Sequence, residues 1–278
     1  SVAGIPYGTS VNAEGGVSPY RWSATGLPAG VSISSDGQVS GTPSAAGTSQ
    51  VVLTVRDNGG VSASRTLSLT ISASNDCDVL RCIALTFDDG PDAYSDALLK
   101  ALTNGHAKAT FFDVGSQVKT NPAAVARKSA AGMEVGVHGY DHVDYTLYEV
   151  GYIRYDLNAA ASAIDSATGD WPTLFRPPYG FYDDNVINAA GDVGLATVMW
   201  TDNTWDYEYT KAEADALRWD TLDLARRNSV MLMHDVVATA TALPNIISDL
   251  QGEGYTLVTV STLAGGTLKP YTVNYEEG

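Results

Sequence analysis

The residues of this sequence that could do chemistry are a few histidines and a pair of adjacent carboxylates. Asp88 and Asp89 stand side by side in an Asp-Asp-Gly-Pro turn, and His138 and His142 are four residues apart. Two imidazoles and one carboxylate form a donor set that suits zinc or another divalent transition metal and leaves positions open for water and substrate. Two histidines at this spacing arise often by chance, but the second carboxylate strengthens the pattern because it could take a proton from an attacking water.

Three further polar residues follow short apolar runs in the same way. They are Arg176 in Arg-Pro-Pro-Tyr-Gly, Asp206 and His234. A turn with a helix N-cap is the structural alternative for Asp-Asp-Gly-Pro, but it explains only one of the two aspartates. The fourth histidine, His106, follows Asn-Gly before an apolar run, and we predict an ordinary surface residue.

Short apolar runs alternate with amphipathic stretches in the region that contains these residues. The apolar runs predict buried strands at 83–87, 109–112, 133–137, 196–200, 230–233 and 255–260. The amphipathic stretches predict helices at 95–102, 122–131, 153–167, 184–190, 212–225 and 242–250. Repeated strand–helix units favour a distorted (β/α) barrel of about seven mostly parallel strands. In such barrels the active site lies at the carboxyl ends of the strands, which is where the polar residues stand.

The first 72 residues have a different character. Alternating runs at 50–56 and 65–71, separated by Asp-Asn-Gly-Gly, predict half-buried strands joined by a tight turn. The segments Pro19-Tyr-Arg-Trp22, Gly26-Leu-Pro-Ala-Gly30 and Gly41-Thr-Pro43 resemble the immunoglobulin-like module of many exported bacterial proteins. We therefore expect an immunoglobulin-like β-sandwich at 1–72, a linker at 73–81 and a catalytic domain at 82–278.

Composition limits the partners of the chain. With 16 basic and 32 acidic residues the net charge is −16, which disfavours nucleic acid and anionic membranes as partners. No apolar run reaches the roughly 20 residues that a membrane helix needs. The chain starts at Ser1 without an apolar leader, and we expect a secreted monomer whose signal peptide is absent from this chain.

For Cys77 and Cys82, a local disulfide and two free thiols are both open, with the disulfide favoured in an exported protein.

Five motifs, taken in order, identify the second region. They are Thr86-Phe-Asp-Asp-Gly-Pro91, His138-x3-His142, Arg176-Pro-Pro-Tyr-Gly180, Asn203-Thr-Trp-Asp-Tyr207 and Leu232-Met-His234. They resemble the motifs of the polysaccharide deacetylases, also called carbohydrate esterase family 4 or the NodB-homology domain. The resemblance covers residues 82–265, and the first, third and fifth motifs match very closely.

The resemblance implies a metal site and a general base. It assigns one divalent ion to Asp89, His138 and His142, expected to be Zn²⁺, with Co²⁺, Ni²⁺ and Mn²⁺ as alternatives. It makes Asp88 the base that activates the attacking water, with Arg176 paired to it.

The resemblance also implies how the reacting groups are held. The backbone N–H of Tyr179 would stabilise the oxyanion, and Leu232 would line the pocket for the acetyl methyl group. His234 would be the general acid, with its pKa raised by Asp206. Trp205 is a candidate substrate contact. Other aromatic residues near these loops could also stack on sugars: Tyr140, Tyr145, Trp171, Tyr182 and Tyr207.

Two departures from the family pattern matter. Val137 and Gly139 flank the first histidine where the family has Asn and Ser or Thr, so the hydroxyl that braces the second histidine is missing. Motif four ends in Asp206-Tyr207 where the family has Asp-Trp, and it opens with Asn203 where the family has Asp. Asp202 is therefore the alternative to Asp206 as the residue that raises the pKa of the general acid.

The leading hypothesis is a deacetylase acting on N-acetylglucosamine polymers or oligomers, with chitin and chito-oligosaccharides favoured because a neutral polymer avoids repulsion from an acidic protein. A peptidoglycan deacetylase and an acetylxylan esterase would use the same residues. A carbohydrate-binding protein without activity is a further alternative, disfavoured because base, ligands, arginine and acid are all present.

Overall fold

A computed structural model describes residues 3, 7–71, 77 and 80–275 of the chain. The chain divides into two compact units, Ser1–Leu80 and Arg81–Gly278. Most of the expected linker, 73–81, lies outside the described residues. Both cysteines are disulfide-bonded. Because the chain contains only two, the bond joins Cys77 to Cys82, and the local disulfide is confirmed.

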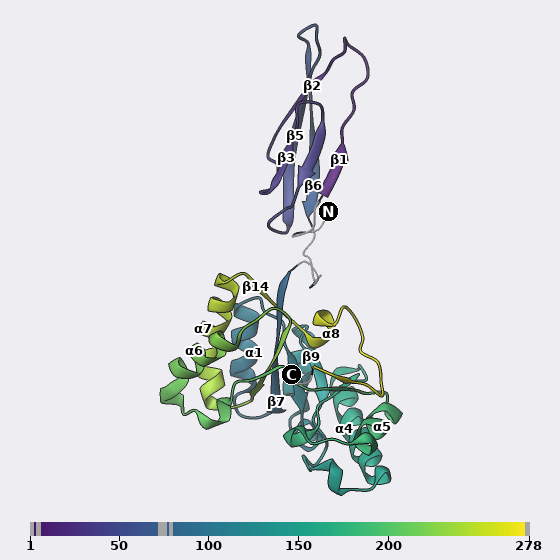
Figure 1. Ribbon diagram of the computed structural model, residues 1–278, viewed down its shortest axis with the longest axis vertical. Helices are drawn as coiled ribbons and strands as arrows, with labels where there is room; N and C mark the ends of the chain where they lie inside the picture. The colour runs from purple at the N-terminus through teal and green to yellow at the C-terminus, as the bar shows by residue number, and fades with distance from the viewer. Residues whose placement is uncertain (1–2, 4–6, 72–76, 78–79, 276–278) are drawn as a thin grey trace. The chain divides into compact units, whose positions relative to one another are not determined.

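The first unit consists of two antiparallel three-stranded sheets, in the orders β1-β4-β3 and β2-β5-β6 (Figure 1). Gly37, in the turn between β3 and β4, has a φ of +92°, and a Cβ built on it would lie 2.9 Å from the Trp22 ring of β2. Glycine is required there by the left-handed backbone and by the close approach of the ring. The strands are β1 Tyr7–Ser10, β2 Arg21–Thr25, β3 Val31–Ile33, β4 Gln38–Gly41, β5 Gly47–Arg56 and β6 Ser62–Ile71.

The second unit contains a nine-stranded sheet in which every pairing is parallel. Its order is β12-β13-β7-β8-β9-β10-β11-β15, and β14 also pairs with β7. Over the described part of the chain β12 and β15 do not pair with each other, so the sheet is an open, distorted (β/α) barrel, as predicted. The strands are β7 Arg81–Gly90, β8 Thr110–Asp113, β9 Glu134–Val137, β10 Leu174–Phe175, β11 Ala196–Val198, β12 Asp202–Asn203, β13 Ser229–His234, β14 Tyr255–Val258 and β15 Val273–Asn274.

Helices cover the sheet, with α1, α6 and α7 grouped on one side of β7 and α4 and α5 on the other (Figure 1). No helix in the described residues is long and apolar enough to cross a membrane. The helices are α1 Ser95–Asn104, α2 Gly115–Thr120, α3 Pro122–Ala130, α4 Val150–Thr168, α5 Asp184–Asp192, α6 Ala214–Leu224, α7 Val237–Gly252 and α8 Val260–Leu263, with 3₁₀ turns η1 Tyr145–Leu147, η2 Pro178–Gly180, η3 Asp206–Glu208 and η4 Lys211–Glu213.

Packing in the core determines which side chains of the central strand β7 face the site. Leu85 and Phe87 belong to a hydrophobic cluster with residues of α1 and α7, whereas Ala84 belongs to a different cluster with Phe112 of β8. Side chains alternate along a strand, so Thr86 and Asp88 point to the same side as Ala84, away from α1 and α7.

Candidate active site

The predicted site residues gather at the carboxyl ends of neighbouring parallel strands. Asp88 and Asp89 end β7, and the other residues end or closely follow β9, β10, β12 and β13. Parallel pairing brings these ends to one edge of the sheet. The remaining residues of the group are His138, His142, Arg176, Tyr179, Trp205, Asp206, Leu232 and His234.

Backbone conformation at this edge is unusual. Among the described residues, positive φ angles at non-glycine positions include those of Asp89 (70°), His142 (53°), Tyr179 (61°) and Trp205 (54°). Such conformations are costly, persist only where the surrounding structure imposes them, and gather at functional sites.

Asp89, His138 and His142 form one cluster. The Nε2 atoms of His138 and His142 lie 3.4 and 3.0 Å from Oδ1 of Asp89, and one ligand atom from each residue lies within 4.8 Å of the others. Nδ1 of His138 is 2.8 Å from the backbone carbonyl oxygen of Arg176. A carbonyl only accepts, so Nδ1 carries the proton and Nε2 presents its lone pair to the cluster.

The two carboxylates also favour positive charge at this cluster. Oδ1 of Asp89 is buried and, within the described part of the chain, has no hydrogen-bond partner, although two ring nitrogens are close. Burial lowers the pKa of His138, but the charge of Asp88 and the contact with Asp89 outweigh it and raise that pKa above its usual value. These residues therefore fit a divalent metal ion, which would supply the positive charge and bind the unpartnered oxygen of Asp89.

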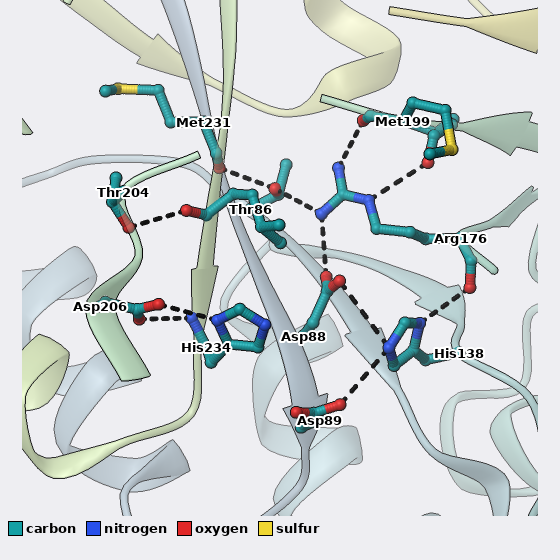
Figure 2. A network of polar contacts seen from close by, with 12 residues as sticks. Thr86, Asp88, Asp89, His138, Arg176, Met199, Thr204, Asp206, Met231 and His234 are labelled. Carbon is teal, nitrogen blue, oxygen red and sulfur yellow. Dashed lines mark hydrogen bonds and ion pairs between the residues drawn. The ribbon is translucent and has the colours of Figure 1, made fainter. Parts of the chain in front are cut away.

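Asp88 lies between the guanidinium of Arg176 and this cluster (Figure 2). Its Oδ1 accepts a 2.8 Å hydrogen bond from Nη1 of Arg176. Arg176 is fully buried, and three further N–H groups donate to Thr86 Oγ1 at 2.7 Å and to the carbonyls of Val198 and Met199 at 3.1 and 2.7 Å. The arginine is thus fixed by four contacts and holds the Asp88 carboxylate in one orientation.

His234 stands on the other side of Asp88, paired with Asp206 (Figure 2). Its Nδ1 is 2.7 Å from Oδ1 of Asp206, and its backbone N–H donates to Oδ2 at 2.6 Å. Burial lowers the pKa of His234, but the hydrogen bond and charge of Asp206 outweigh it and raise that pKa above its usual value. Asp202, the alternative partner, forms an ion pair with Arg226 at 2.8 Å instead.

A cavity of about 430 Å³ opens over these groups. Tyr179 and Trp205 contribute largely exposed rings to it, whereas Leu232 contributes a buried apolar wall. An acetylated sugar could therefore place its ring against the aromatic side chains and its methyl group against the leucine. The other residues of the wall are Asp88, Asp89, His138, His142, Pro177, Gly180, Trp200, Asn203, Tyr207, His234 and Val236.

Four of the aromatic candidates do not line this cavity: Tyr140, Tyr145, Trp171 and Tyr182. Tyr145 is fully buried and donates its hydroxyl hydrogen to Asp156, so its prediction as a sugar contact is wrong. Trp171 donates its indole N–H to the Val193 carbonyl at 3.3 Å and lines a separate, smaller cavity.

Sequence reasoning missed two supporting residues. Thr86 accepts from Arg176, and Thr239 of α7 donates to Asp206. Thr86 could have been found, because it stands two residues before Asp88 in a strand and so shares its face. Thr239 gives no such signal, since only the packing of α7 brings it to Asp206.

Comparisons with known proteins agree with this geometry. The family model "Polysaccharide deacetylase" matches residues 76–198, and an Ig domain model matches residues 1–72. The chain is 31% identical over 188 residues to a peptidoglycan-N-acetylglucosamine deacetylase of Bacillus cereus, covering 66% of this chain and 88% of the relative. It is 35% identical over 189 residues to the peptidoglycan-N-acetylglucosamine deacetylase PgdA of Listeria monocytogenes, covering 67% of this chain but only 40% of that relative's length.

A solved structure described as T48 deacetylase with substrate shares 35% identity with the chain at a TM-score of 0.67, covering 72% of this chain and 98% of that one. Fold and site thus combine an open (β/α) barrel with a cavity lined by histidines and carboxylates at the ends of its strands. The chain belongs to the polysaccharide deacetylase family, carbohydrate esterase family 4, and carries an immunoglobulin-like domain ahead of it.

Proposed function

We propose that this protein is a secreted, metal-dependent deacetylase that hydrolyses the N-acetyl groups of N-acetylglucosamine polymers or oligomers and releases acetate. The observation that carries the proposal is the convergence of three metal-ligand side chains, a base and an acid on one cavity. A divalent ion held by Asp89, His138 and His142, with Zn²⁺ expected, would act as a Lewis acid toward the acetyl carbonyl.

Asp88 and Arg176 act on the attacking water. Asp88 takes a proton from the water as the water oxygen bonds to the acetyl carbon, and the 2.8 Å hydrogen bond from Arg176 orients the Asp88 carboxylate for that transfer. The backbone N–H of Tyr179 donates to the oxyanion that forms.

His234 and Asp206 act on the leaving group. As the carbon–nitrogen bond breaks, His234 donates a proton to the amine nitrogen, and the 2.7 Å contact with Asp206 keeps the imidazole charged and oriented for that transfer. Leu232 receives the acetyl methyl group, and Trp205, half exposed at the rim, packs against the sugar.

Two observations bear on the substrate. The net charge of −16 favours a neutral polymer such as chitin over an anionic one. The names of the Bacillus and Listeria relatives favour the glycan of peptidoglycan, which is the second candidate.

A disulfide at Cys77–Cys82 supports export, because disulfides persist in oxidising compartments.

The test measures acetate released from defined chito-oligosaccharides, peptidoglycan and acetylxylan by the wild type and Asp88→Asn. Loss of a general base is expected to lower kcat at least roughly a hundredfold without changing the unfolding midpoint. Asp92→Asn, an exposed aspartate just beyond the same turn, is the matched control and should keep wild-type kcat.

A chelator should abolish turnover, and added Zn²⁺ should restore it. Full activity of Asp88→Asn, or of chelated protein, contradicts the mechanism. Acetate from acetylxylan alone indicates an esterase, and none from any substrate indicates a binding protein.

A further inference from the structure

The loop that carries both histidine ligands has no regular secondary structure of its own, and its backbone is strained. Residues 138–142 belong to no helix or strand, and within them Gly139 and His142 have φ angles of +77° and +53°. A left-handed backbone at a non-glycine residue persists only where contacts impose it. The placement of both imidazoles therefore depends on what holds this loop.

Backbone groups at the start of α2 hold one side of the loop. The N–H of Gly115 donates to the Gly139 carbonyl at 2.8 Å, and the N–H of Ser116 donates to the Tyr140 carbonyl at 3.1 Å. A Cβ on Gly115 would lie 2.7 Å from the Tyr140 ring, so α2 and the loop are in close contact.

Helix α4 holds the other side through Asp156. Its Oδ1 accepts a 2.7 Å hydrogen bond from the backbone N–H of Tyr140 and a second hydrogen bond from the Tyr145 hydroxyl. Asp156 is 2% exposed and Tyr145 is not exposed at all. A buried carboxylate depends on its donors, because losing one leaves it poorly solvated.

Tyr145 also contacts the ligand loop directly. A Cβ on Gly139 would lie only 2.5 Å from the Tyr145 hydroxyl oxygen, so this hydroxyl occupies the space where a side chain of residue 139 would begin. The Tyr145 ring packs edge-on to Phe175 with centroids 6.0 Å apart. Phe175 precedes Arg176, whose carbonyl accepts the Nδ1 proton of His138, so one packed unit fixes both the loop and the histidine tautomer.

We propose that Tyr145 and Asp156 are positioning residues for the metal ligands His138 and His142. The inference rests on the proposed metal site and adds to it two residues that touch neither metal nor substrate. The hydroxyl that fixes the loop comes from Tyr145, seven residues after the first histidine, and Gly139 is required because any larger side chain would displace it.

The test is a calorimetric titration of metal-free protein with Zn²⁺. Tyr145→Phe removes only the hydroxyl, and its Kd for Zn²⁺ is expected to rise about 10- to 100-fold, the usual effect of losing an outer hydrogen bond at a metal site. Tyr155→Phe is the matched control, because Tyr155 is next to Asp156 on α4 and is 75% exposed. Its Kd should equal that of the wild type.

Urea unfolding of the same metal-free proteins separates positioning from stability. If Tyr145→Phe unfolds more easily but binds Zn²⁺ with wild-type Kd, the hydroxyl has only a structural role and the inference is overturned. If the wild type itself binds no divalent ion, the proposed metal site fails, and with it everything that rests on that site.

Gly139→Ala tests the same contact without altering a buried ring. The methyl group would displace the Tyr145 hydroxyl, so Zn²⁺ binding should weaken in the wild-type background and weaken less when added to Tyr145→Phe. Backbone strain from alanine is present in both backgrounds and cancels. Equal losses in the two backgrounds would show that the hydroxyl and residue 139 do not act together, which overturns the inference.

Discussion

Asp88 and Asp89 are adjacent in the chain, yet both carboxylates reach the same histidine. Nε2 of His138 is 3.8 Å from Asp88 Oδ2 and 3.4 Å from Asp89 Oδ1. Neighbouring residues of a regular strand point to opposite faces. The register with β8 shifts between Asp88 and Gly90, and Asp89 has a φ of 70°, so the strand turns the second carboxylate toward the first. A local break in β7 thus brings two adjacent carboxylates to the same histidine.

The pairing of His234 with Asp206 predicts how activity depends on pH. In its proposed role as general acid, His234 must be protonated, and because Asp206 raises its pKa, the protonated form persists to higher pH. Asp206→Asn removes that charge and lowers the pKa of His234. The alkaline limb of the kcat profile should therefore move to lower pH, with kcat above the new limb reduced at least roughly tenfold.

The control is Asp202→Asn, which removes the carboxylate that pairs with Arg226. Initial rates at saturating chito-oligosaccharide across the pH range, for both variants, decide the question. If the alkaline limb shifts in Asp202→Asn and does not shift in Asp206→Asn, the residue that raises the pKa of His234 is Asp202 and the prediction is wrong.

At the scale of elements, the sequence predicts the strands that carry a full apolar run of their own. It misses the short strands, which are defined only by pairing with neighbouring strands. All six strands predicted in the second region exist, whereas β10, β12 and β15, which were not predicted, are two residues each and exist through pairing with neighbours. The six predicted helices are present, and the short α2 and α8 were not predicted.

The same limit applies to the site. The motifs place these residues at the strand ends, because both the motifs and the apolar runs before them can be identified in the sequence itself. The contacts of Asp156 and Thr239 depend on how α4 and α7 pack, which no local pattern reveals. The roles assigned to the site residues stay predictions until variants are measured.

Helix α3 is anchored to β8 by a buried ion pair between Lys128 and Asp113, 2.7 Å apart with side chains 1% and 0% exposed. Lys128→Met would leave Asp113 buried without a counter-charge, and Oδ2 of that residue already lacks a partner among the described residues. Breaking such a pair is expected to lower the free energy of unfolding by about 3–5 kcal/mol, measured by urea denaturation.

The preceding residue supplies the control for this prediction. Arg127 pairs with Asp96 at 2.8 Å, but both side chains are largely exposed. Arg127→Met should therefore cost less than about 1 kcal/mol. Adding Asp113→Val to Lys128→Met should recover much of the loss, because an apolar pair removes the uncompensated charge. Equal, small losses in the two single variants would mean that Lys128 is not needed to compensate Asp113.

At the scale of the whole molecule, the candidate active site belongs to one compact unit. Every residue that lines the active-site cavity belongs to the second compact unit, Arg81–Gly278, which has its own hydrophobic core. Deleting residues 1–72 keeps both cysteines and the whole (β/α) barrel. The truncated protein should therefore fold, checked by circular dichroism, and keep kcat on short soluble chito-oligosaccharides within about twofold.

The same truncation tells what the first unit contributes, because removing a spacer, a stabiliser or an adhesion module changes different measured properties of the protein. Loss of adhesion lowers the rate on insoluble chitin and leaves soluble substrates unaffected, since only the insoluble polymer must be held at a surface. Loss of a stabiliser lowers the unfolding midpoint of the barrel, and loss of a spacer changes neither. A large fall in kcat on the short oligosaccharides, with the barrel still folded, would show instead that residues 1–72 take part in the chemistry.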